Sequence, residues 1–268
     1  LDAQDRTRQV RQHRNRRAVD HFDWYAQDGR WDRLYDPGNP VSHSFLTRRR
    51  RSVELMRDLE GKTVLDLGCG TGALIPALAG ITGINYLGVD AAPNMVQESQ
   101  NLLHSLQLED TFSIKTSDVR DVPVEDGSFD RVVGMGLLEY FDDPTSVIRE
   151  ACRVCLPGGL IVFSTPRKGS LNDLIVRSTT VPRMLMRRFS GEIRDVPRTR
   201  LSPKDFRTEF DSFPVKFANH AFYNKLLLPY PFTRVAPRAS RTAARLVEHR
   251  DRFNRLATGY IVAFHRIS

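Results

Sequence analysis

The residues with the clearest chemical potential are acids and glycines in the first half of this 268-residue chain. Asp66 stands inside an apolar run, and three glycines follow it at two-residue spacing, namely Gly68, Gly70 and Gly72. Glycines let the backbone turn sharply and let a ligand lie directly on the main chain. Asp90 follows a second apolar run, where a carboxylate can accept hydrogen bonds from ribose hydroxyls. The pattern predicts a strand, a tight turn and a helix that bind a nucleoside-bearing ligand.

The glycine spacing alone leaves two kinds of ligand open. Gly68, Gly70 and Ala73 also satisfy the G-x-G-x-x-G/A fingerprint of dinucleotide-binding proteins. Asp66 argues against a pyrophosphate, because like charges repel, and favours a ligand with cationic groups. Asp118 follows a third apolar segment, where it can meet an adenine amino group. The acids therefore favour a cationic nucleoside over a dinucleotide.

The order of the motifs resembles that of the class I S-adenosylmethionine-dependent methyltransferases. The segments that carry the resemblance are Val64–Gly72, Tyr86–Asp90, Ala91–Met95, Ser117–Val119, Ser128–Val133, Leu137–Tyr140 and Leu156–Leu160. They cover residues 60–166 in the order of that family. The resemblance implies an α/β fold with a seven-stranded Rossmann-like sheet in the order 3-2-1-4-5-7-6 and helices on both faces. It also implies S-adenosylmethionine as cofactor and S-adenosylhomocysteine as product.

The resemblance also implies where the cofactor binds, namely at the glycine turn, the ends of the next two strands and the segment after the fourth strand. The implied contacts are Asp66, Gly68, Cys69, Gly70, Gly72, Asp90, Ala91, Met95, Asp118, Val119, Met135 and Leu137. Arg48 joins them as the arginine of the run 48–51 that could pair with the cofactor carboxylate, because a guanidinium matches a carboxylate bidentately. The other three arginines of the run are expected to be solvated.

Methyl transfer from a sulfonium is an in-line displacement, so the protein must mainly hold nucleophile and methyl group near attack distance. A base is needed only when the nucleophile is a hydroxyl or a protonated amine. No motif identifies that base, and the candidates are Tyr25, Tyr35, His43, Glu139, Tyr140, His220 and Tyr223. The Asn/Asp-Pro-Pro-Tyr/Phe signature of nucleobase and glutamine methyltransferases is absent, because Gly134–Leu137 occupies that strand end.

The segments on either side of the motifs differ from them in composition. Residues 1–58 combine helical periodicity with dense aromatics and predict an N-terminal helical lid, before a methyltransferase domain over 59–268. Apolar residues and arginines mix at 167–200 and 224–257, and these segments are expected to be substrate-cap insertions. Their apolar residues could line a pocket for a hydrophobic substrate, dip into a membrane interface or pack on the sheet.

Three further observations bound the structure. Alternating polarity over Phe213–Tyr223 and Thr258–Arg266 predicts the last two strands. Cys152 and Cys155 form a C-x-x-C pair without a second pair or histidines at ligand spacing, so we expect structural thiols and no metal. No apolar run approaches the roughly 20 residues of a membrane-spanning helix. Together with a polar start, this predicts a cytoplasmic protein, with membrane association left open.

Charge is distributed unevenly along the chain. Residues 61–150 carry 5 Lys or Arg against 14 Asp or Glu, whereas residues 151–268 carry 22 against 8. A basic half attracts anions such as a carboxylate or phosphate, a nucleic acid or an anionic membrane surface. The alternative to an anionic partner is that the excess arginines are merely solvated. Arginine outnumbers lysine 34 to 6 in this chain.

These observations favour S-adenosylmethionine-dependent methyl transfer, most simply at oxygen, to a small hydrophobic and anionic acceptor. Lipid-like, isoprenoid, polyketide and tetrapyrrole acceptors all fit a cap that is both apolar and basic. One alternative is an RNA methyltransferase, although the basic region is interleaved with leucine and methionine rather than with stacking aromatics. The other is a cofactor-binding protein without catalysis. The sequence leaves the oligomeric state undetermined.

Overall fold

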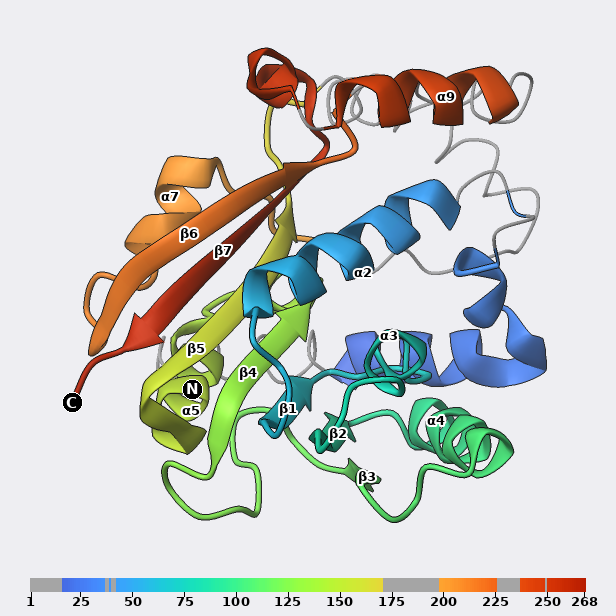
Figure 1. Cartoon of the computed structure of the whole chain (residues 1–268), viewed down its shortest axis with the longest axis vertical. Helices are drawn as coiled ribbons and strands as arrows, with labels where there is room; N and C mark the ends of the chain where they lie inside the picture. Colours follow the sequence, from blue (N-terminus) through green and yellow to red (C-terminus); the bar gives the residue numbers. More distant parts are fainter. Residues whose placement is uncertain (1–15, 37–38, 40–41, 171–197, 226–236, 249) are drawn as a thin grey trace, which may run out of the picture.

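A single seven-stranded sheet forms the centre of the molecule (Figure 1). The computed structural model describes residues 16–36, 39, 42–170, 198–225, 237–248 and 250–268. The strand order is β3-β2-β1-β4-β5-β7-β6, which confirms the predicted order. Neighbours among the first five strands pair in parallel, and β7 pairs antiparallel with β5 and β6. The strands are β1 (Thr63–Leu67), β2 (Asn85–Asp90), β3 (Phe112–Thr116), β4 (Phe129–Met135), β5 (Cys155–Pro166), β6 (Val215–Tyr223) and β7 (Gly259–Arg266).

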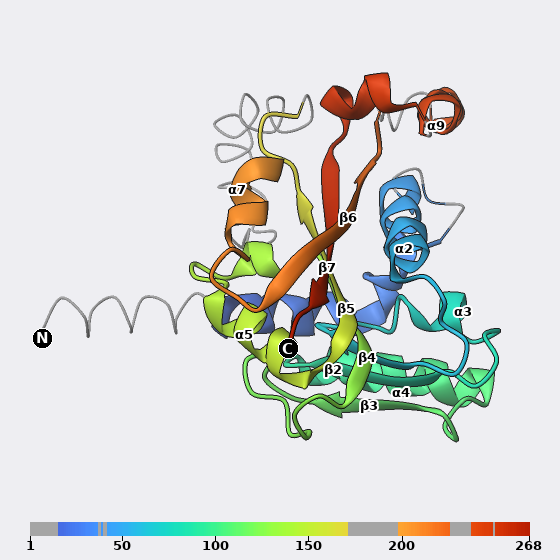
Figure 2. The ribbon, with the colours of Figure 1, turned by 60° about the vertical axis from the view of Figure 1, so that its left-hand side comes forward.

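Helices cover both faces of this sheet (Figures 1 and 2). The α-helices are α2 (Ser42–Met56), α3 (Ile75–Leu78), α4 (Pro93–Leu106), α5 (Thr145–Val154), α7 (Pro203–Thr208) and α9 (Pro237–Val247), with a further helix over 16–26. Short 3-10 turns are η1 (Gln27–Gly29), η2 (Asp32–Leu34), η3 (Leu138–Tyr140) and η4 (Asp251–Leu256). The core residues show α2, α3 and α4 on one face and α5 and α7 on the other.

Both faces of the central strands are buried, which explains why these strands are nearly continuous apolar runs in the sequence. Successive side chains of a strand point to opposite faces. Val64 accordingly packs under α2 and α3, whereas Leu65 and Leu67 pack with the residues of α5 and α7, and all three are fully buried. Burying each such side chain contributes roughly 1.5–3 kcal/mol.

The carboxyl ends of β1, β2 and β4 meet at the edge where the strand order reverses, which is where α/β proteins bind their ligands. The helix over 16–26 lies across this edge. The Asp23 carboxylate accepts hydrogen bonds from the Asn94 main-chain N at 2.7 Å and from its Nδ2 at 2.8 Å. Asn94 lies in the first turn of α4, whose own N-cap residue makes no side-chain capping bond. Asp23 therefore caps α4 from a distant segment and ties the N-terminal helix to it.

The second predicted insertion is described in part, as α9 and η4 with residues 237–248 and 250–257, whereas 226–236 lies outside the described residues. Arg51 of α2 donates from Nε to Glu248 Oε1 at 3.4 Å and from Nη2 to the Glu248 carbonyl at 3.2 Å. The expectation that Arg51 is solvated was therefore wrong, because it fastens the end of α9 to α2. Arg49 is also engaged, since it donates to the Ala73 carbonyl at 3.3 Å.

Most of the first predicted insertion, residues 171–197, also lies outside the described residues. The chain is described again from residue 198 and enters α7, where Ser202 Oγ accepts a hydrogen bond from Asp205 N at 3.1 Å. Within the described parts of the chain, no helix is long and apolar enough to cross a membrane.

Candidate active site

A cavity of about 540 Å³ lies at the carboxyl edge of the sheet, against the helix over 16–26. The lining residues come from two groups of segments. We call the part lined by the glycine turn and the acids that follow β2 and β3 the glycine-turn end, and the part lined by η3 and the segments around residues 167 and 198–200 the other end, while α2 contributes Ser44, Phe45 and Arg48 to the lining. Of the cofactor contacts implied by the sequence, those that line the cavity are Arg48, Gly68, Gly70, Asp90, Ala91, Met95, Asp118, Val119, Met135 and Leu137.

The glycine turn lies open to the cavity at Gly70. A Cβ at Gly70 would stand 3.5 Å from Trp31 Nε1 and 3.8 Å from Met95 Sδ, so among the described residues these two side chains lie against the main chain there. Its φ of 56° lies in the left-handed region that glycine adopts without strain. The turn therefore presents bare backbone to a ligand held between Trp31 and Met95.

Asp90 is fixed at the end of β2 by the main chain around it. Its Oδ2 accepts from Gly70 N and its Oδ1 accepts from Ala92 N, both at 2.9 Å. Burial raises the pKa of the carboxyl above its ordinary value, and the backbone hydrogen bonds oppose that shift. Each carboxylate oxygen keeps a further lone pair. Asp90 can therefore brace the glycine turn and also accept hydrogen bonds from a ligand in the cavity.

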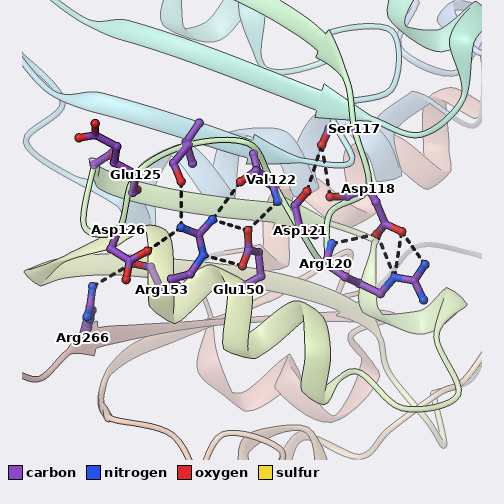
Figure 3. Close-up of polar contacts among 12 residues, drawn as sticks. Ser117, Asp118, Arg120, Asp121, Val122, Glu125, Asp126, Glu150, Arg153 and Arg266 are labelled. Carbon is purple, nitrogen blue, oxygen red and sulfur yellow. Dashed lines mark hydrogen bonds and ion pairs between the residues drawn. The ribbon is translucent and has the colours of Figure 1, made fainter.

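Asp118 lies on the loop after β3, at the rim of the cavity. Arg120 donates from Nε to Asp118 Oδ1 at 2.9 Å, and its guanidinium lies against both carboxylate oxygens (Figure 3). These hydrogen bonds lower the pKa of Asp118. Arg153 holds the same loop from below, because it donates to the Val122 carbonyl at 2.9 Å and to Glu150 Oε1 at 2.7 Å (Figure 3). The acid stays ionised, and Arg120 neutralises much of its charge.

Asp66 does not line the cavity. It is 1% exposed inside β1, and Tyr86 Oη donates to its Oδ2 at 2.9 Å, while its Oδ1 has no hydrogen-bond partner in the described part of the chain. Burial raises the pKa of Asp66 to about 7. The main-chain amide of the glycine turn that a carboxylate could have bound is taken by Asp90 instead.

The burial of Asp66 makes the free energy of unfolding depend on pH. The folded chain holds the Asp66 proton more tightly than the unfolded chain does. The stabilisation that this proton gives to the folded state is therefore complete below about pH 4 and is lost as pH rises through about 7. The loss can reach about 4 kcal/mol. We expect Asp66→Asn to gain stability over the wild type at pH 8 and to differ little at pH 4.5. Urea unfolding at the two pH values measures this, and parallel pH profiles for both proteins would contradict it.

Cys69 and Gly72 also lie away from the cavity. Cys69 is buried with a free thiol, and a Cβ on Gly72 would collide with Ile75 Cδ1 and stand 2.7 Å from Ser99 Oγ. The φ of Gly72 is +83°, a conformation that strains any side chain. Its glycine is therefore required by packing rather than by direct contact with a ligand.

We expect Gly72→Ala to lower the free energy of unfolding by about 2–4 kcal/mol, from backbone strain and overpacking together. Chemical denaturation measures the change. Gly80→Ala is the matched control, because no heavy atom lies within 4 Å of the Cβ it would add, and we expect little effect there. Equal losses at the two positions would show that the crowding at Gly72 is relieved.

The other end of the cavity surrounds Glu139 on η3. This side chain is 4% exposed, and its Oε2 has no hydrogen-bond partner among the residues that the structure describes. Burial raises the pKa of Glu139, and the nearby guanidinium groups of Arg48, Arg198 and Arg200 oppose the shift. Arg48 itself donates to Tyr35 Oη at 3.1 Å. A buried carboxylate with cationic neighbours in a cavity is a candidate functional group.

The remaining candidate bases divide by position. Tyr25, Tyr140 and Tyr223 line the cavity together with Glu139. Tyr35 does not line the cavity, but its hydroxyl accepts a hydrogen bond from Arg48, which does. His43 is buried within α2 beside Thr47, and His220 lies on the outer strand β6 among aromatic rings, so neither lines the cavity.

Several residues of the cavity wall were not among the predicted site residues. Phe22 and Trp31 line the wall as aromatics of the predicted lid, and His21, Arg167, Arg198 and Arg200 line it without having been predicted. The aromatics belong to the predicted lid, so their density was the available signal. The arginines lie outside regular elements and gave no periodic signal.

The structure describes all three cysteines and many of the potential metal ligands. Cys69, Cys152 and Cys155 are all buried free thiols. Among the described residues there is no group of three or more His, Cys, Asp or Glu side chains that could hold a metal ion.

Residues 65–163 match the sequence model of a family described as methyltransferase domain. The ubiquinone biosynthesis O-methyltransferase of Xanthomonas oryzae pv. oryzae is 36% identical over 143 residues, which are 53% of this chain and 55% of that protein. The chain thus spans about half the length of the curated relatives it matches.

Two solved structures share the fold. A chain from the complex between the Haloferax volcanii Trm112 methyltransferase activator and its methyltransferase partner has a TM-score of 0.64 at 24% identity, covering 92% of this chain and 98% of that one. Geranyl diphosphate C-methyltransferase from Streptomyces coelicolor A3(2) has a TM-score of 0.61 at 13% identity, covering 90% and 86%. Residues 65–163 are therefore similar to the methyltransferase domain family, within a chain whose strand order is that of the class I S-adenosylmethionine-dependent methyltransferase fold.

Proposed function

We propose that this chain transfers a methyl group from S-adenosylmethionine to a hydroxyl of a small, hydrophobic and anionic acceptor. One observation carries the proposal. A single cavity connects the carboxylate of Asp90, braced on the glycine turn, with the buried carboxylate of Glu139. The first suits the ribose of a nucleoside, and the second suits a hydroxyl that must lose a proton.

The residues at the glycine-turn end fit S-adenosylmethionine. Asp90 would accept hydrogen bonds from the ribose hydroxyls, and Gly70 leaves room for the ligand beside Trp31. Asp118, at the rim, would accept from the adenine amino group. Within the described ranges Arg48 has a buried Nε without a hydrogen-bond partner, which suits the carboxylate of the cofactor. When bound, the cofactor supplies an activated methyl group.

The residues at the other end fit the acceptor. Phe22, Phe45 and Phe141 give the wall an apolar surface, which excludes water from the acceptor. Glu139 would accept the proton of the hydroxyl, because its open Oε2 belongs to a buried side chain that lines the cavity. The tyrosines are poorer bases, since burial raises the pKa of Tyr140 to about 12 and raises that of Tyr223 further.

The Xanthomonas relative supports oxygen as the attacked atom, and the Streptomyces structure, of a C-methyltransferase, supports only a hydrophobic and anionic acceptor. The Xanthomonas relative is an O-methyltransferase of ubiquinone biosynthesis by its name. The Streptomyces structure contains geranyl diphosphate, which is both apolar and anionic. A cavity with phenylalanine walls and arginines at one end is suited to the same combination.

Calorimetry and a turnover assay test the proposal together. We expect saturable binding of S-adenosylmethionine and S-adenosylhomocysteine and no comparable binding of NAD. Incubation with phenolic and enolic acceptors should release S-adenosylhomocysteine and give a methyl ether by mass spectrometry. Equal affinity for NAD would overturn the cofactor assignment. Tight cofactor binding without turnover on any hydroxyl acceptor would instead favour a binding protein without catalysis.

We further propose that the protein contacts an anionic membrane through a patch on α9 and η4, here called the α9–η4 surface. Its exposed basic and large apolar residues include Arg238, Arg245, Leu246, Arg250, Arg252, Arg255 and Leu256, and the acid Asp251 is exposed among them. Leu246 is 65% exposed, and arginines beside exposed leucines suit an interface of acidic headgroups over acyl chains. The two elements lie together at one end of the molecule, beyond α2 (Figures 1 and 2).

The α9–η4 surface adjoins the cavity. Arg167 lines the cavity, and its Nη1 donates to the Asn254 carbonyl of η4 at 3.0 Å. A hydrophobic acceptor dissolved in the membrane would therefore have a short path to the active site.

Vesicle flotation tests this contact. We expect recovery with vesicles containing anionic lipid at low salt and a loss of binding as salt rises, because the screening length is about 10 Å at 0.1 M. Reversing charge at Arg245 and Arg255 should reduce recovery, whereas reversal at the exposed Arg16 and Arg149, elsewhere on the molecule, should matter less. Equal binding to neutral vesicles, or stronger binding to RNA than to anionic vesicles, would overturn the proposal.

A further inference from the structure

We propose that Arg48 is shared between the cofactor and the base, because the guanidinium that binds the cofactor carboxylate also holds the Glu139 carboxylate in its ionised form. Arg48 is then a positioning residue through which Glu139 responds to the arrival of the cofactor. This inference rests on the proposed function for the identity of the cofactor and the role of Glu139. It goes beyond that function by linking the two through one side chain.

Arg48 and Glu139 meet over the main chain of Gly136, and all three residues line the cavity. A Cβ added at Gly136 would collide with Arg48 Nη1 and stand 3.2 Å from Glu139 Oε1, so both charged groups lie on the side that the glycine leaves open. The φ of Gly136 is +66°, and its N donates to Ser164 Oγ at 2.9 Å. The main chain is thus fixed in a left-handed conformation that leaves room for a guanidinium beside a carboxylate.

The nitrogens of the Arg48 guanidinium face different groups. Nη1 lies at Gly136 beside Glu139, and Nη2 donates to Tyr35 Oη at 3.1 Å. Nε is buried and has no hydrogen-bond partner within the parts of the chain that the structure describes. The Phe45 ring, whose centre lies 5.3 Å from the guanidinium carbon, restrains the group. Arg48 can therefore bind a carboxylate through Nε while Nη1 stays beside Glu139.

The charge of Arg48 acts on Glu139 across this contact. Burial raises the pKa of Glu139, and the Arg48 cation is the largest of the influences that lower it. Further titratable groups that act on Glu139 from the described elements are Arg198, Arg200, Tyr140 and Tyr223. A carboxylate bound to Arg48 partly cancels the field of its guanidinium, so the pKa of Glu139 rises when the cofactor is bound. Glu139 then becomes a stronger base at the moment when the methyl donor is in place.

Cofactor binding and proton binding are therefore linked. At pH values around the pKa of Glu139, the chain should take up a fraction of a proton when the cofactor carboxylate reaches Arg48. By reciprocity, the affinity for the cofactor should increase as pH falls through that pKa. A ligand that lacks the carboxylate should bind without this uptake.

Asp66 is the competing source of a proton change. Burial raises its pKa to about 7, and the Arg48 cation acts on it less than burial and the hydrogen bond from Tyr86 do. Asp66 also lies behind the glycine turn and does not line the cavity. We therefore assign the uptake to Glu139, and Asp66→Asn separates the two acids.

Calorimetry in buffers of different ionisation enthalpy measures the uptake on the full chain. The probes are S-adenosylhomocysteine and its decarboxylated analogue, which lacks only the carboxylate. Groups that respond to the nucleoside, such as Asp90, respond to both probes alike. We expect S-adenosylhomocysteine to bring about half a proton per site more than the analogue, for a pKa change of about one pH unit at Glu139.

Four variants identify the residues involved. Glu139→Gln should abolish the difference in uptake between the probes, whereas Asp66→Asn should keep it. Arg48→Gln should abolish it together with the preference for S-adenosylhomocysteine over the analogue, and Arg48→Lys should restore part of both because it keeps the charge. Arg50→Gln is the control, since Arg50 is exposed on the same helix and its replacement removes the same charge. Thermal unfolding shows whether each variant is folded.

Equal uptake with the two probes in the wild type would overturn the inference. A difference that survives in Glu139→Gln, or that disappears in Asp66→Asn, would overturn it as well. If Arg48→Gln does not fold, the probe comparison in the wild type and in Glu139→Gln still decides. Absence of S-adenosylhomocysteine binding in the wild type would overturn the proposed function and this inference with it, whereas binding without the difference in uptake would overturn this inference alone.

Discussion

Replacing Asp90 with alanine is expected to weaken binding of S-adenosylmethionine by about 10- to 100-fold, or roughly 1–3 kcal/mol. Two effects add. The ribose hydroxyls lose a charged acceptor, and the amides of Gly70 and Ala92 lose the carboxylate that holds them at 2.9 Å. The glycine turn then has to be ordered by the ligand itself, which costs further binding energy. Calorimetry on the purified variant gives the affinity directly.

Two comparison variants separate these effects. Asp90→Asn keeps the shape and one oxygen acceptor, so it should lose less affinity than the alanine variant. Asp110→Ala removes an exposed acid of the same acidic half and should leave the affinity unchanged. An Asp90→Ala variant with wild-type affinity would show that the carboxylate serves the fold alone.

Replacing Glu139 with glutamine is expected to lower kcat by about 100-fold or more, which is roughly 3 kcal/mol of transition-state stabilisation. The variant keeps the shape of the side chain and removes its ability to accept a proton. Burial raises the pKa of Glu139, so the wild-type rate should increase with pH through an apparent pKa above the ordinary value of a glutamate. That limb of the pH profile should disappear in Glu139→Gln.

The kinetic measurements must distinguish a residue that accepts the proton from one that only positions the acceptor. Cofactor affinity should stay within a fewfold of wild type, because Glu139 belongs to the acceptor end of the cavity. Tyr223→Phe provides the comparison, since burial raises the pKa of Tyr223 and keeps it protonated at neutral pH. It should change KM more than the pH profile. A pH limb that survives in Glu139→Gln and vanishes in Tyr223→Phe would transfer the role of base to the tyrosine.

The fold could be predicted because local sequence and topology agree. Apolar runs such as Val64–Leu67 are buried on both faces in the structure, and the observed strand order confirms the sheet order that the resemblance implied. The acceptor end could be predicted only in outline. Its residues come from the N-terminal segment, η3 and residues 198–200, and only tertiary contacts such as Thr199 N to the Glu139 carbonyl bring them together. No periodicity in a single sequence records such contacts.

The acids and glycines near the turn show a second limit of prediction from the sequence. The resemblance implied that Asp66, Gly70 and Gly72 all contact the cofactor, but the structure gives the three residues different surroundings. Gly70 faces the cavity, whereas Asp66 pairs with Tyr86 behind it and Gly72 packs against Ser99. A side chain in a strand and a glycine in a turn can point to either face at the same spacing, so only the folded main chain decides which of them reaches the cavity.

The placement of Trp31 over Gly70 has a spectroscopic consequence. The chain contains two tryptophans, and they stand in different optical environments. Trp24 is 40% exposed, with Arg30 over its ring at 4.2 Å, whereas Trp31 lines the cavity among Phe22, Tyr25 and Phe45. An indole that touches the glycine turn changes its emission when an adenosyl group arrives there. In a Trp24→Phe background the protein thus carries its own fluorescent reporter, and stopped-flow mixing can time the filling of the turn without an added dye.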